Sequence, residues 1–379
     1  MGTLERDEAK SSDDSNCCLL MTVETPSLVI EPASGAPKPG SGIGVATINY
    51  RTKNQTLRCV ESLRQSETPP DWLYVLDNSE LDDGLEAALR AMAPFERTRI
   101  AYYRSPKNLG FAEGSNVLID RLFESTDCQF VLFLNNDAVA LPPLLGKLKQ
   151  ALIDHPGAGL SGPRVHKLDD PTQIDSLGIV LYKSLMPADR YSIDEPYLGP
   201  SGGCAMATRA CLAKLKRTAG YFFDPKLFCY CEDTDLVLRA NLLGYQPYFV
   251  NDVLALHEGQ ASTSKGYNRF IAYHGIRNST WVALKLVPTR FLIRHAGWHA
   301  LAHLLSIAHH AIRGRFGLLL DVYRDLLKGF ASIHSDRLRI RSSTGMSGAP
   351  THPKIANRFY REGYLAEGLR RTLTIRRSL

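Results

Sequence analysis

A chain of 379 residues, of which 44% are hydrophobic and 22% charged, has enough apolar side chains to bury a large core. This length predicts one large globular domain with shorter appended segments. The eight cysteines follow no regular spacing, which excludes a disulfide-rich secreted scaffold. Cys17 and Cys18 lie in a polar segment, while Cys229 and Cys231 alternate in what we interpret as a strand. A reducing cytosolic compartment is therefore expected.

The first 40 residues differ in composition from the rest of the chain. They are rich in Ser, Pro, Gly and Asp, and they contain no apolar stretch behind a basic start, so no secretory signal is predicted. Arg6 also stands where a myristoylation signal has Ser or Thr. We expect a disordered leader over residues 1–40.

Between residues 43 and 165, short apolar runs alternate with helix-like segments. The runs are "IGVATINY", "WLYVLDN", "RIAYYRS" and "FVLFLNND", and the helix-like segments span residues 54–65, 111–125 and 143–155. This order predicts an α/β fold with a mostly parallel sheet, in which ligands bind at the carboxyl ends of the strands.

Polar side chains end three of these strands: Asn49, Asp77 and Asp137. Amides and carboxylates are costly to bury unless something binds them. Each one alone could simply cap a turn or a helix. Three of them at one edge of a sheet favour a ligand site.

The loop "NLGFAEGSN", residues 108–116, leads from the third strand into a helix and carries Gly110 and Gly114. Glycines at a helix start let backbone amides approach the sugar or phosphate of a ligand. The dinucleotide fingerprint GxGxxG is absent from the first strand-to-helix turn, which reads "NYRTKNQT". A nicotinamide-dependent enzyme is therefore disfavoured.

Six motifs, in this order and spacing, resemble the family 2 glycosyltransferases and, within them, the rhamnosyltransferase-like branch. They are "VATINYRTKNQTLRCVESL", "VLDNS", "NLGFAEGSN", "FLNNDA", "SGGCAMATR" and "CYCEDTDLVLRANLLGY", and they cover roughly residues 43–285. The resemblance implies the A-type glycosyltransferase fold and inversion of the anomeric centre. A Rossmann-like nucleotide-binding half, residues 41–140, would join an acceptor half, residues 141–287, in one catalytic domain over 41–287.

The resemblance also implies roles for single residues. Asp77 matches the carboxylate that hydrogen bonds the base of a uridine or thymidine diphosphate sugar, and Asp233 matches the general base. Asn135 and Asp137 match the ends of the metal-binding DxD motif. The expected nucleotide-sugar-binding set is Thr47, Asn49, Asp77, Asn108, Gly110, Asn116, Asn135 and Asn136. The expected set around the acceptor or donor sugar is Gly202, Gly203, Glu232 and Arg239.

A divalent cation is expected because negative charge develops on the diphosphate as the glycosidic bond breaks. Asp137 supplies a carboxylate oxygen, but the family motif has a carboxylate where this chain has Asn135. Phosphate and water are therefore expected to supply most of the ligands. His257, in "LALHEG", stands where many relatives place a further ligand, and an imidazole favours Mn²⁺ as an alternative to Mg²⁺. A purely structural His257 is the other interpretation.

The acceptor hydroxyl must lose a proton as it attacks, and a nearby carboxylate can accept it. "EDTDLVLRA" offers Glu232, Asp233 and Asp235 at the start of a predicted helix. Acidic residues in a first helical turn also complement the helix dipole without any catalysis. Arg239 lies four residues after Asp235, so the two are expected to form a supporting ion pair.

Residues 288–379 carry 16 Lys and Arg against 5 Asp and Glu, a balance of +11 that leaves −5 for the rest of the chain. Residues 288–341 predict a helical extension with an apolar stripe. No apolar run of 18 residues occurs there, so a surface-bound amphipathic helix is favoured over a membrane span. The stripe consists of Leu301, Leu304, Leu305, Ala308 and Ile312.

Three histidines in this extension, His295, His299 and His303, share one predicted helical face. A metal ladder is possible there, but packed or exposed histidines are the favoured interpretation. Residues 342–379 form a basic tail that would strengthen attraction to anionic lipid. No nucleic-acid-binding module accompanies the tail, so no specific nucleic acid partner is predicted.

The resemblance implies an enzyme that transfers rhamnose from its thymidine diphosphate donor to a glycolipid or polysaccharide, and the basic, amphipathic C-terminal segment predicts that it acts at the cytoplasmic face of a membrane. The same fold acting on a uridine diphosphate hexose is one alternative. A sugar-nucleotide-binding protein without turnover is another, because Asn135 removes one carboxylate from the metal motif.

Overall fold

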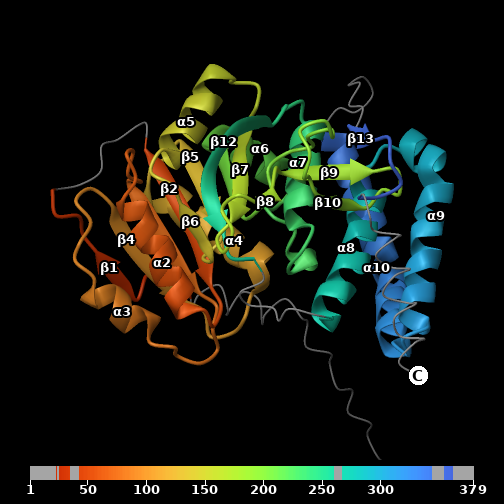
Figure 1. Cartoon of the computed structure of the whole chain (residues 1–379), viewed down its shortest axis with the longest axis horizontal. Helices are drawn as coiled ribbons and strands as arrows, with labels where there is room; N and C mark the ends of the chain where they lie inside the picture. The colour runs from red at the N-terminus through yellow and green to blue at the C-terminus, as the bar shows by residue number, and fades with distance from the viewer. Residues whose placement is uncertain (1–22, 24, 35–41, 260–266, 344–353, 362–379) are drawn as a thin grey trace, which may run out of the picture.

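Figure 1 shows the computed structural model of the chain, in which residues 23, 25–34, 42–259, 267–343 and 354–361 are described. A twisted sheet covered by helices occupies one end of the molecule, and long helices occupy the other. The predicted α/β class, the mostly parallel mixed sheet and the helical C-terminal region are confirmed.

The large sheet has the strand order β1-β4-β3-β2-β5-β11-β7-β12-β6, with β8 paired to β7. Strands β4, β3, β2 and β5 run parallel, as do β7 and β12, whereas β1, β11, β6 and β8 pair antiparallel with their neighbours. The bounds are β1 Leu28–Ile30, β2 Ile43–Asn49, β3 Trp72–Asp77, β4 Arg99–Arg104, β5 Phe130–Leu134, β6 Ala138–Ala140, β7 Leu160–Lys167, β8 Ile174–Ser176, β11 Cys204–Thr208 and β12 Tyr248–His257.

Alternate residues of the central strands enter two different cores, because successive strand side chains point to opposite faces of a sheet. Leu73 and Val75 of β3 pack on the face that α2, α3 and α5 cover. Tyr74 and Leu76 pack on the other face with α4 and α6. The bounds are α2 Lys53–Arg64, α3 Leu85–Ala91, α4 Gly110–Ser125, α5 Leu144–Asp154 and α6 Arg209–Ala219.

Much of the rest of the described chain builds a second region beside the part of the large sheet that holds β7 and β8 (Figure 1). A small sheet has the order β10-β9-β13, and the helices α8, α9 and α10 stand next to it (Figure 1). Arg337 of α10 is buried and donates through Nη1 to the carbonyls of Leu284 (2.6 Å) and Val287 (2.9 Å) at the end of α8. The bounds are β9 Ile179–Tyr182, β10 Pro187–Asp189, η2 Pro225–Leu227, α7 Glu232–Leu242, α8 Arg269–Leu286, α9 Thr289–Ala311, α10 Phe316–Ser343 and β13 Ile355–Ala356.

Two local expectations differ from the structure. Leu28–Ile30, inside the predicted leader, pairs with β4, while residues 1–22, 24 and 35–41 lie outside the described residues. The strand expected at Cys229 and Cys231 is wrong. Residues 228–231 form a turn in which Phe228, Tyr230 and Cys231 all have positive φ angles of 64° to 68°, so the alternating pattern there does not reflect a pleated strand.

The three predicted histidines of α9 each contact a neighbouring element. His295 donates through Nδ1 to the Lys183 carbonyl at 3.1 Å, and His299 donates to the Ser184 carbonyl at 2.8 Å. His303 contacts the Tyr323 hydroxyl at 2.9 Å. The packed interpretation therefore holds for all three. No helix within the described part of the chain is long and apolar enough to cross a membrane.

Candidate active site

The three polar strand ends meet at one edge of the sheet, as the sequence predicted. Strand β2 lies between β3 and β5 and runs parallel to both. Asn49 stands directly beside Asp77 in the β2–β3 register. Asp137 follows the end of β5, the other neighbour of β2.

Asn49 and Asp77 form the floor of this edge. Asp77 is fully buried, and its Oδ1 accepts hydrogen bonds from Asn49 Nδ2 (2.9 Å) and the Ser79 amide (3.0 Å). Its Oδ2 accepts one from the Tyr102 hydroxyl at 2.9 Å. Both carboxylate oxygens thus already have protein partners. Thr47 is buried in β2, two residues before Asn49 at the end of that strand.

The residues between β5 and Asp137 connect this edge to its surroundings. Asn136 Nδ2 donates to Thr52 Oγ1 at 2.6 Å and to Thr56 Oγ1 at 2.7 Å, which fixes it to the start of α2. Asn135 donates its backbone amide to the Gly203 carbonyl at 3.0 Å. The strand end is therefore held from two sides.

Asp137 and His257 lie side by side although 120 positions separate them. His257 Nε2 is 3.0 Å from Asp137 Oδ1, and His257 Nδ1 is 2.8 Å from Asp175 Oδ2. Burial lowers the pKa of His257, but the hydrogen bonds to the two carboxylates outweigh it and raise that pKa to about 10. Without a metal, the two carboxylate contacts therefore favour the protonated form of the His257 imidazole.

These side chains fit part of a metal site. Within residues 42–259, 267–343 and the other described ranges, no three His, Cys, Asp or Glu side chains form a ready metal cluster. Asp137 and His257 nevertheless offer an oxygen and a nitrogen ligand next to each other, and Asp175 orients the imidazole through its other nitrogen, as carboxylates commonly do for metal-bound histidines. The remaining ligands would have to come from the bound diphosphate and water.

The glycine loop at the start of α4 is shaped by a close approach of two backbones. Gly110 has φ +75°, and an added Cβ would lie 2.5 Å from the Phe228 carbonyl oxygen, so only glycine fits there. Asn108 Oδ1 accepts from the Gly110 amide at 2.8 Å. Asn116 Nδ2 donates to the Phe223 carbonyl at 2.9 Å and to Glu113 Oε2 at 3.2 Å, and Asn116 Oδ1 accepts from the Phe223 amide at 2.8 Å. Direct contact of Asn116 with a nucleotide sugar would therefore require breaking these bonds.

Asp233 is held at the start of α7 by backbone amides. Its Oδ2 accepts from the Gly202 amide at 2.9 Å and its Oδ1 accepts from the Thr234 amide at 2.6 Å. Burial raises the pKa of Asp233, and these hydrogen bonds oppose the rise. Its neighbour Glu232 is buried, and burial together with Asp233 raises the pKa of Glu232 well above the usual range.

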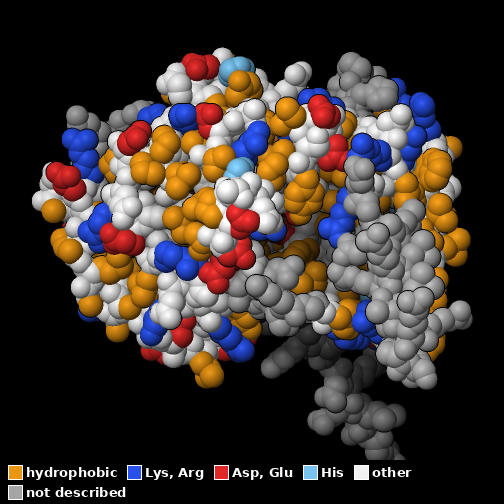
Figure 2. Space-filling view, viewed as in Figure 1, with side chains coloured by type: hydrophobic (Ala, Val, Ile, Leu, Met, Phe, Trp, Pro, Cys, Tyr) orange, Lys and Arg blue, Asp and Glu red, His pale blue; other side chains and the backbone are white. Residues whose placement is uncertain are grey.

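A cavity of about 460 Å³ opens beside Asp233. Figure 2 shows a recess near the middle of the molecule, with acidic side chains close to it. The cavity walls are mostly apolar and come from β9, β10 and the turn between them, from α8 and α9, and from the segment after β13. They include Ile179, Met186, Ile271, Ile276, Leu305 and Phe359. Asp189 also lines it. Although Asp189 is solvent-accessible in this cavity, the surrounding protein and then Asp233 raise its pKa to about 6.

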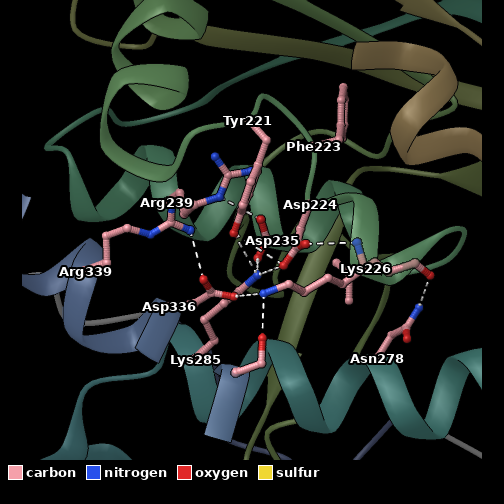
Figure 3. Close-up of polar contacts among 12 residues, drawn as sticks. Tyr221, Phe223, Asp224, Lys226, Asp235, Arg239, Asn278, Lys285, Asp336 and Arg339 are labelled. Atoms are coloured by element: carbon pink, nitrogen blue, oxygen red, sulfur yellow. Dashed lines mark hydrogen bonds and ion pairs between the residues drawn. The ribbon is translucent and has the colours of Figure 1, made fainter. Parts of the chain in front are cut away.

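Arg239 has a structural place in a buried polar network behind α7 (Figure 3). Its Nε donates to Asp235 Oδ1 at 2.6 Å, which confirms the predicted pair. Lys285 of α8 forms ion pairs with both Asp235 and Asp224. Lys226 bonds Asp336 of α10 at 2.7 Å. This network joins the helix that carries Asp233 to the C-terminal helices.

Two carboxylates near the site were not predicted. Asp175 and Asp189 lie in the stretch between β7 and β11, where short strands and turns give no periodic signal and no family motif. Only the folded structure places Asp175 on His257 and Asp189 near Asp233.

Comparison with known proteins gives a family match for part of the chain. Residues 43–215 match the model described as Glycosyl transferase family 2. No curated protein matches the chain. Among solved structures, GalNAc-T7 with UDP, GalNAc and Mn²⁺ has a TM-score of 0.50 at 12% identity, over 71% of this chain and 51% of that chain.

Two further structures are similar at slightly lower TM-scores. The mannosyltransferase PcManGT from Pyrobaculum calidifontis, in complex with GDP-Man and Mn²⁺, has a TM-score of 0.49 at 16% identity, over 84% of this chain and 91% of that chain. TarS 1–349 of S. aureus has a TM-score of 0.47 at 14% identity, over 80% of this chain and 89% of that chain. The match over residues 43–215, just under half of the chain, supports a glycosyltransferase, and the similarity to GalNAc-T7 concerns the fold.

Proposed function

We propose that this protein is an inverting glycosyltransferase that moves rhamnose from a thymidine diphosphate donor to a glycan or glycolipid acceptor. The observation that carries the proposal is the link made by two adjacent glycines. The Gly203 carbonyl accepts a hydrogen bond from the Asn135 amide at the strand end. The Gly202 amide donates one to Asp233 Oδ2 beside the cavity. The donor-side edge and the candidate base are thus joined by one short loop.

The proposed roles follow from this arrangement. The strand-end edge around Asn49 and Asp77 binds the nucleotide, with the Gly110 loop beside it. Asp137 and His257 would hold Mg²⁺ or Mn²⁺, which stabilises the negative charge that develops on the leaving diphosphate. Asp233 accepts the proton of the acceptor hydroxyl as that oxygen attacks the anomeric carbon. The attack comes from the face opposite the diphosphate, which inverts the configuration.

The apolar cavity beside Asp233 supports a glycolipid acceptor more than a soluble polysaccharide. Its walls offer aliphatic and aromatic side chains that a lipid or polyisoprenoid portion can cover, whereas a purely glycan acceptor gains little from them. The basic C-terminal region supports a peripheral location at the cytoplasmic face of a membrane.

A uridine diphosphate hexose is the second candidate donor. The same edge would bind a uracil base, and the GalNAc-T7 structure, which shares the fold, contains UDP and Mn²⁺. Binding without turnover is the third candidate, because Asn135 replaces one carboxylate of the metal motif.

A donor panel separates these three functions. The full chain is incubated with thymidine diphosphate rhamnose or a uridine diphosphate hexose, with Mn²⁺, Mg²⁺ or a chelator, and release of nucleoside diphosphate is measured beside thermal stability. A donor at a hundred times its Kd stabilises the protein by about 2.7 kcal/mol. Stabilisation by a donor without any release, with every acceptor lipid offered, would refute the enzymatic proposal.

A further inference from the structure

A second cavity, of about 600 Å³, lies beside the first turns of α9 and shares no lining residue with the cavity at Asp233. It is bounded by α9, by the turn between β9 and β10, and by β13. Its lining includes Lys183, Phe291, Arg294, His295, Trp298 and Lys354. None of the roles proposed above involves this cavity.

The charges that line this cavity are all positive. Lys183, Arg294 and Lys354 come from three separate segments, and no Asp or Glu lines the cavity. Within the described part of the chain, none of the three forms an ion pair. Like charges gathered around a hollow repel one another unless an anion binds between them. The cavity therefore has the chemistry of a phosphate site.

His295 contributes shape and a neutral ring to this cavity. Its Nδ1 donates to the Lys183 carbonyl, which ties α9 to the β9–β10 turn. Burial lowers the pKa of His295, the hydrogen bond to the Lys183 carbonyl opposes this, and the charges of Arg294 and Lys183 lower the pKa further. The positive charge in the cavity is therefore that of the lysines and the arginine.

The outer face of α9 next to the cavity is apolar and exposed. Ile293 is 73% exposed, Trp298 44%, Leu301 38% and Leu304 62%. Helix α9 contains no Asp or Glu over its 23 residues. Apolar side chains line the outer edge of the molecule where α9 runs (Figures 1 and 2). A helix with such a face beside a cationic hollow suits the interface of an anionic bilayer, where tryptophan is favoured at headgroup level.

We propose that this cavity binds the phosphate headgroup of an anionic phospholipid while the exposed face of α9 lies against the bilayer. A free phosphate ion would satisfy the cations but would leave Ile293, Trp298 and Leu304 in water. The inference deepens the peripheral location proposed above, and it does not depend on which sugar is transferred.

The test compares two double variants of the full chain that each lose two positive charges. Lys183→Gln with Arg294→Gln changes the cavity, and Arg97→Gln with Arg217→Gln removes two exposed charges outside it. Binding is measured by co-sedimentation with phosphatidylcholine vesicles that contain about a third phosphatidylglycerol. We expect the cavity variant to bind about 30-fold more weakly than wild type, since each basic side chain at an anionic surface contributes roughly a factor of five. The control variant should stay within about threefold of wild type.

Tryptophan fluorescence gives a second readout of the same contact. Trp72 is buried, whereas Trp298 is exposed beside the cavity. Anionic vesicles should shift the emission of the wild-type protein to shorter wavelength, and Trp298→Phe should abolish most of that shift. An unchanged wild-type spectrum would overturn the placement of α9 against the bilayer.

Three results of the binding assay would overturn the proposal. An equal loss of vesicle binding in the two double variants would show that net charge alone attracts the protein to the membrane. Unchanged vesicle binding in both variants would show that the cavity is not a lipid site. In the third result, inorganic phosphate stabilises the wild-type protein against thermal unfolding but not the cavity variant, while both bind vesicles equally. That result would assign the cavity to a free anion. Nucleoside diphosphate release from donor in vesicle-free buffer should be the same in the cavity variant and wild type, so failure here is separate from failure of the glycosyltransferase proposal.

Discussion

Asn278 of α8 holds the turn that leads into α7, the helix that carries Asp233, and its removal tests whether this turn positions the candidate base. Asn278 is fully buried, and its Nδ2 donates to the carbonyls of Leu227 (2.8 Å), Cys229 (2.9 Å) and Tyr230 (2.8 Å). These carbonyls belong to the turn that enters α7. The contact of Asn278 with this turn is visible in Figure 3.

The turn is strained, so it needs such an anchor. Phe228 has φ 64° and ψ −63°, and the Cys229 amide donates to the Leu227 carbonyl at 2.7 Å around it, which is a γ-turn of the rare kind. Tyr230 and Cys231 follow with φ of 68° and 66°. Residues in such conformations cost about 1–3 kcal/mol each and persist only when their surroundings hold them.

Asn278→Ala should therefore lower both stability and turnover. The Asn278 amide shares two N–H groups among the three carbonyls, and the Leu227 carbonyl keeps the Cys229 amide as a donor. At about 1 kcal/mol for each N–H group, the free energy of unfolding should fall by about 2 kcal/mol. The relaxed turn would move Asp233, and a displacement of about 1 Å can lower a rate by about a hundredfold. Urea denaturation measures the first effect, and steady-state release of nucleoside diphosphate measures kcat.

Asn241→Ala is the matched control. Asn241 also donates to two carbonyls, those of Leu198 (3.1 Å) and Val237 (2.8 Å), but at the far end of α7. It should lose about 1–2 kcal/mol of stability and keep its kcat. If Asn278→Ala loses stability but turns over donor like Asn241→Ala, the turn does not position the base and this reasoning is wrong.

Four further substitutions test the site itself. Asp233→Asn should lower kcat by roughly two to four powers of ten and leave donor binding unchanged, whereas Glu232→Gln should leave kcat near that of wild type. A large loss of kcat in Glu232→Gln and none in Asp233→Asn would make Glu232 the base. Asp137→Ala should abolish metal-dependent donor binding in calorimetry, and it should also lower the urea midpoint of the metal-free protein because His257 loses one of its two carboxylate partners. Because the pKa of His257 is about 10 when folded and about 6.5 when unfolded, the free energy of unfolding of the metal-free protein should fall by on the order of 4 kcal/mol between pH 6.5 and 10, and His257→Gln should remove that slope in urea titrations.

The strands and helices of the first half could be predicted closely because their patterns are local. The four apolar runs became β2, β3, β4 and β5, and the expected helix at 54–65 is Lys53–Arg64. Buried parallel strands are continuous apolar runs, and a polar residue ends each run where it reaches the sheet edge. The positions of Asn49, Asp77 and Asp137 could be inferred for the same reason.

The surroundings of those residues could not be predicted, since they depend on contacts between distant segments. Asp175 reaches His257 across 82 positions, and nothing in its own stretch distinguishes it from a surface aspartate. The error at Cys229 and Cys231 has a related cause. A two-residue alternation is too short to separate a strand from a turn with positive φ, and Asn278, which stabilises that turn, lies far along the chain.

The composition change at residue 288 marks a change in surface chemistry, while the buried contacts continue across it. Lys226, near the turn into α7, pairs with Asp336 of α10, and Arg337 binds the carbonyls that end α8. Lys285 lies just before the composition change and is buried between Asp224 and Asp235. Removal of everything after residue 287 would leave the end of α8 without Arg337 and would expose its face toward α10. Such a shortened chain would lose stability near Asp233 as well as membrane affinity. Only substitutions of single side chains, such as Lys183 and Asn278, can therefore separate the two effects.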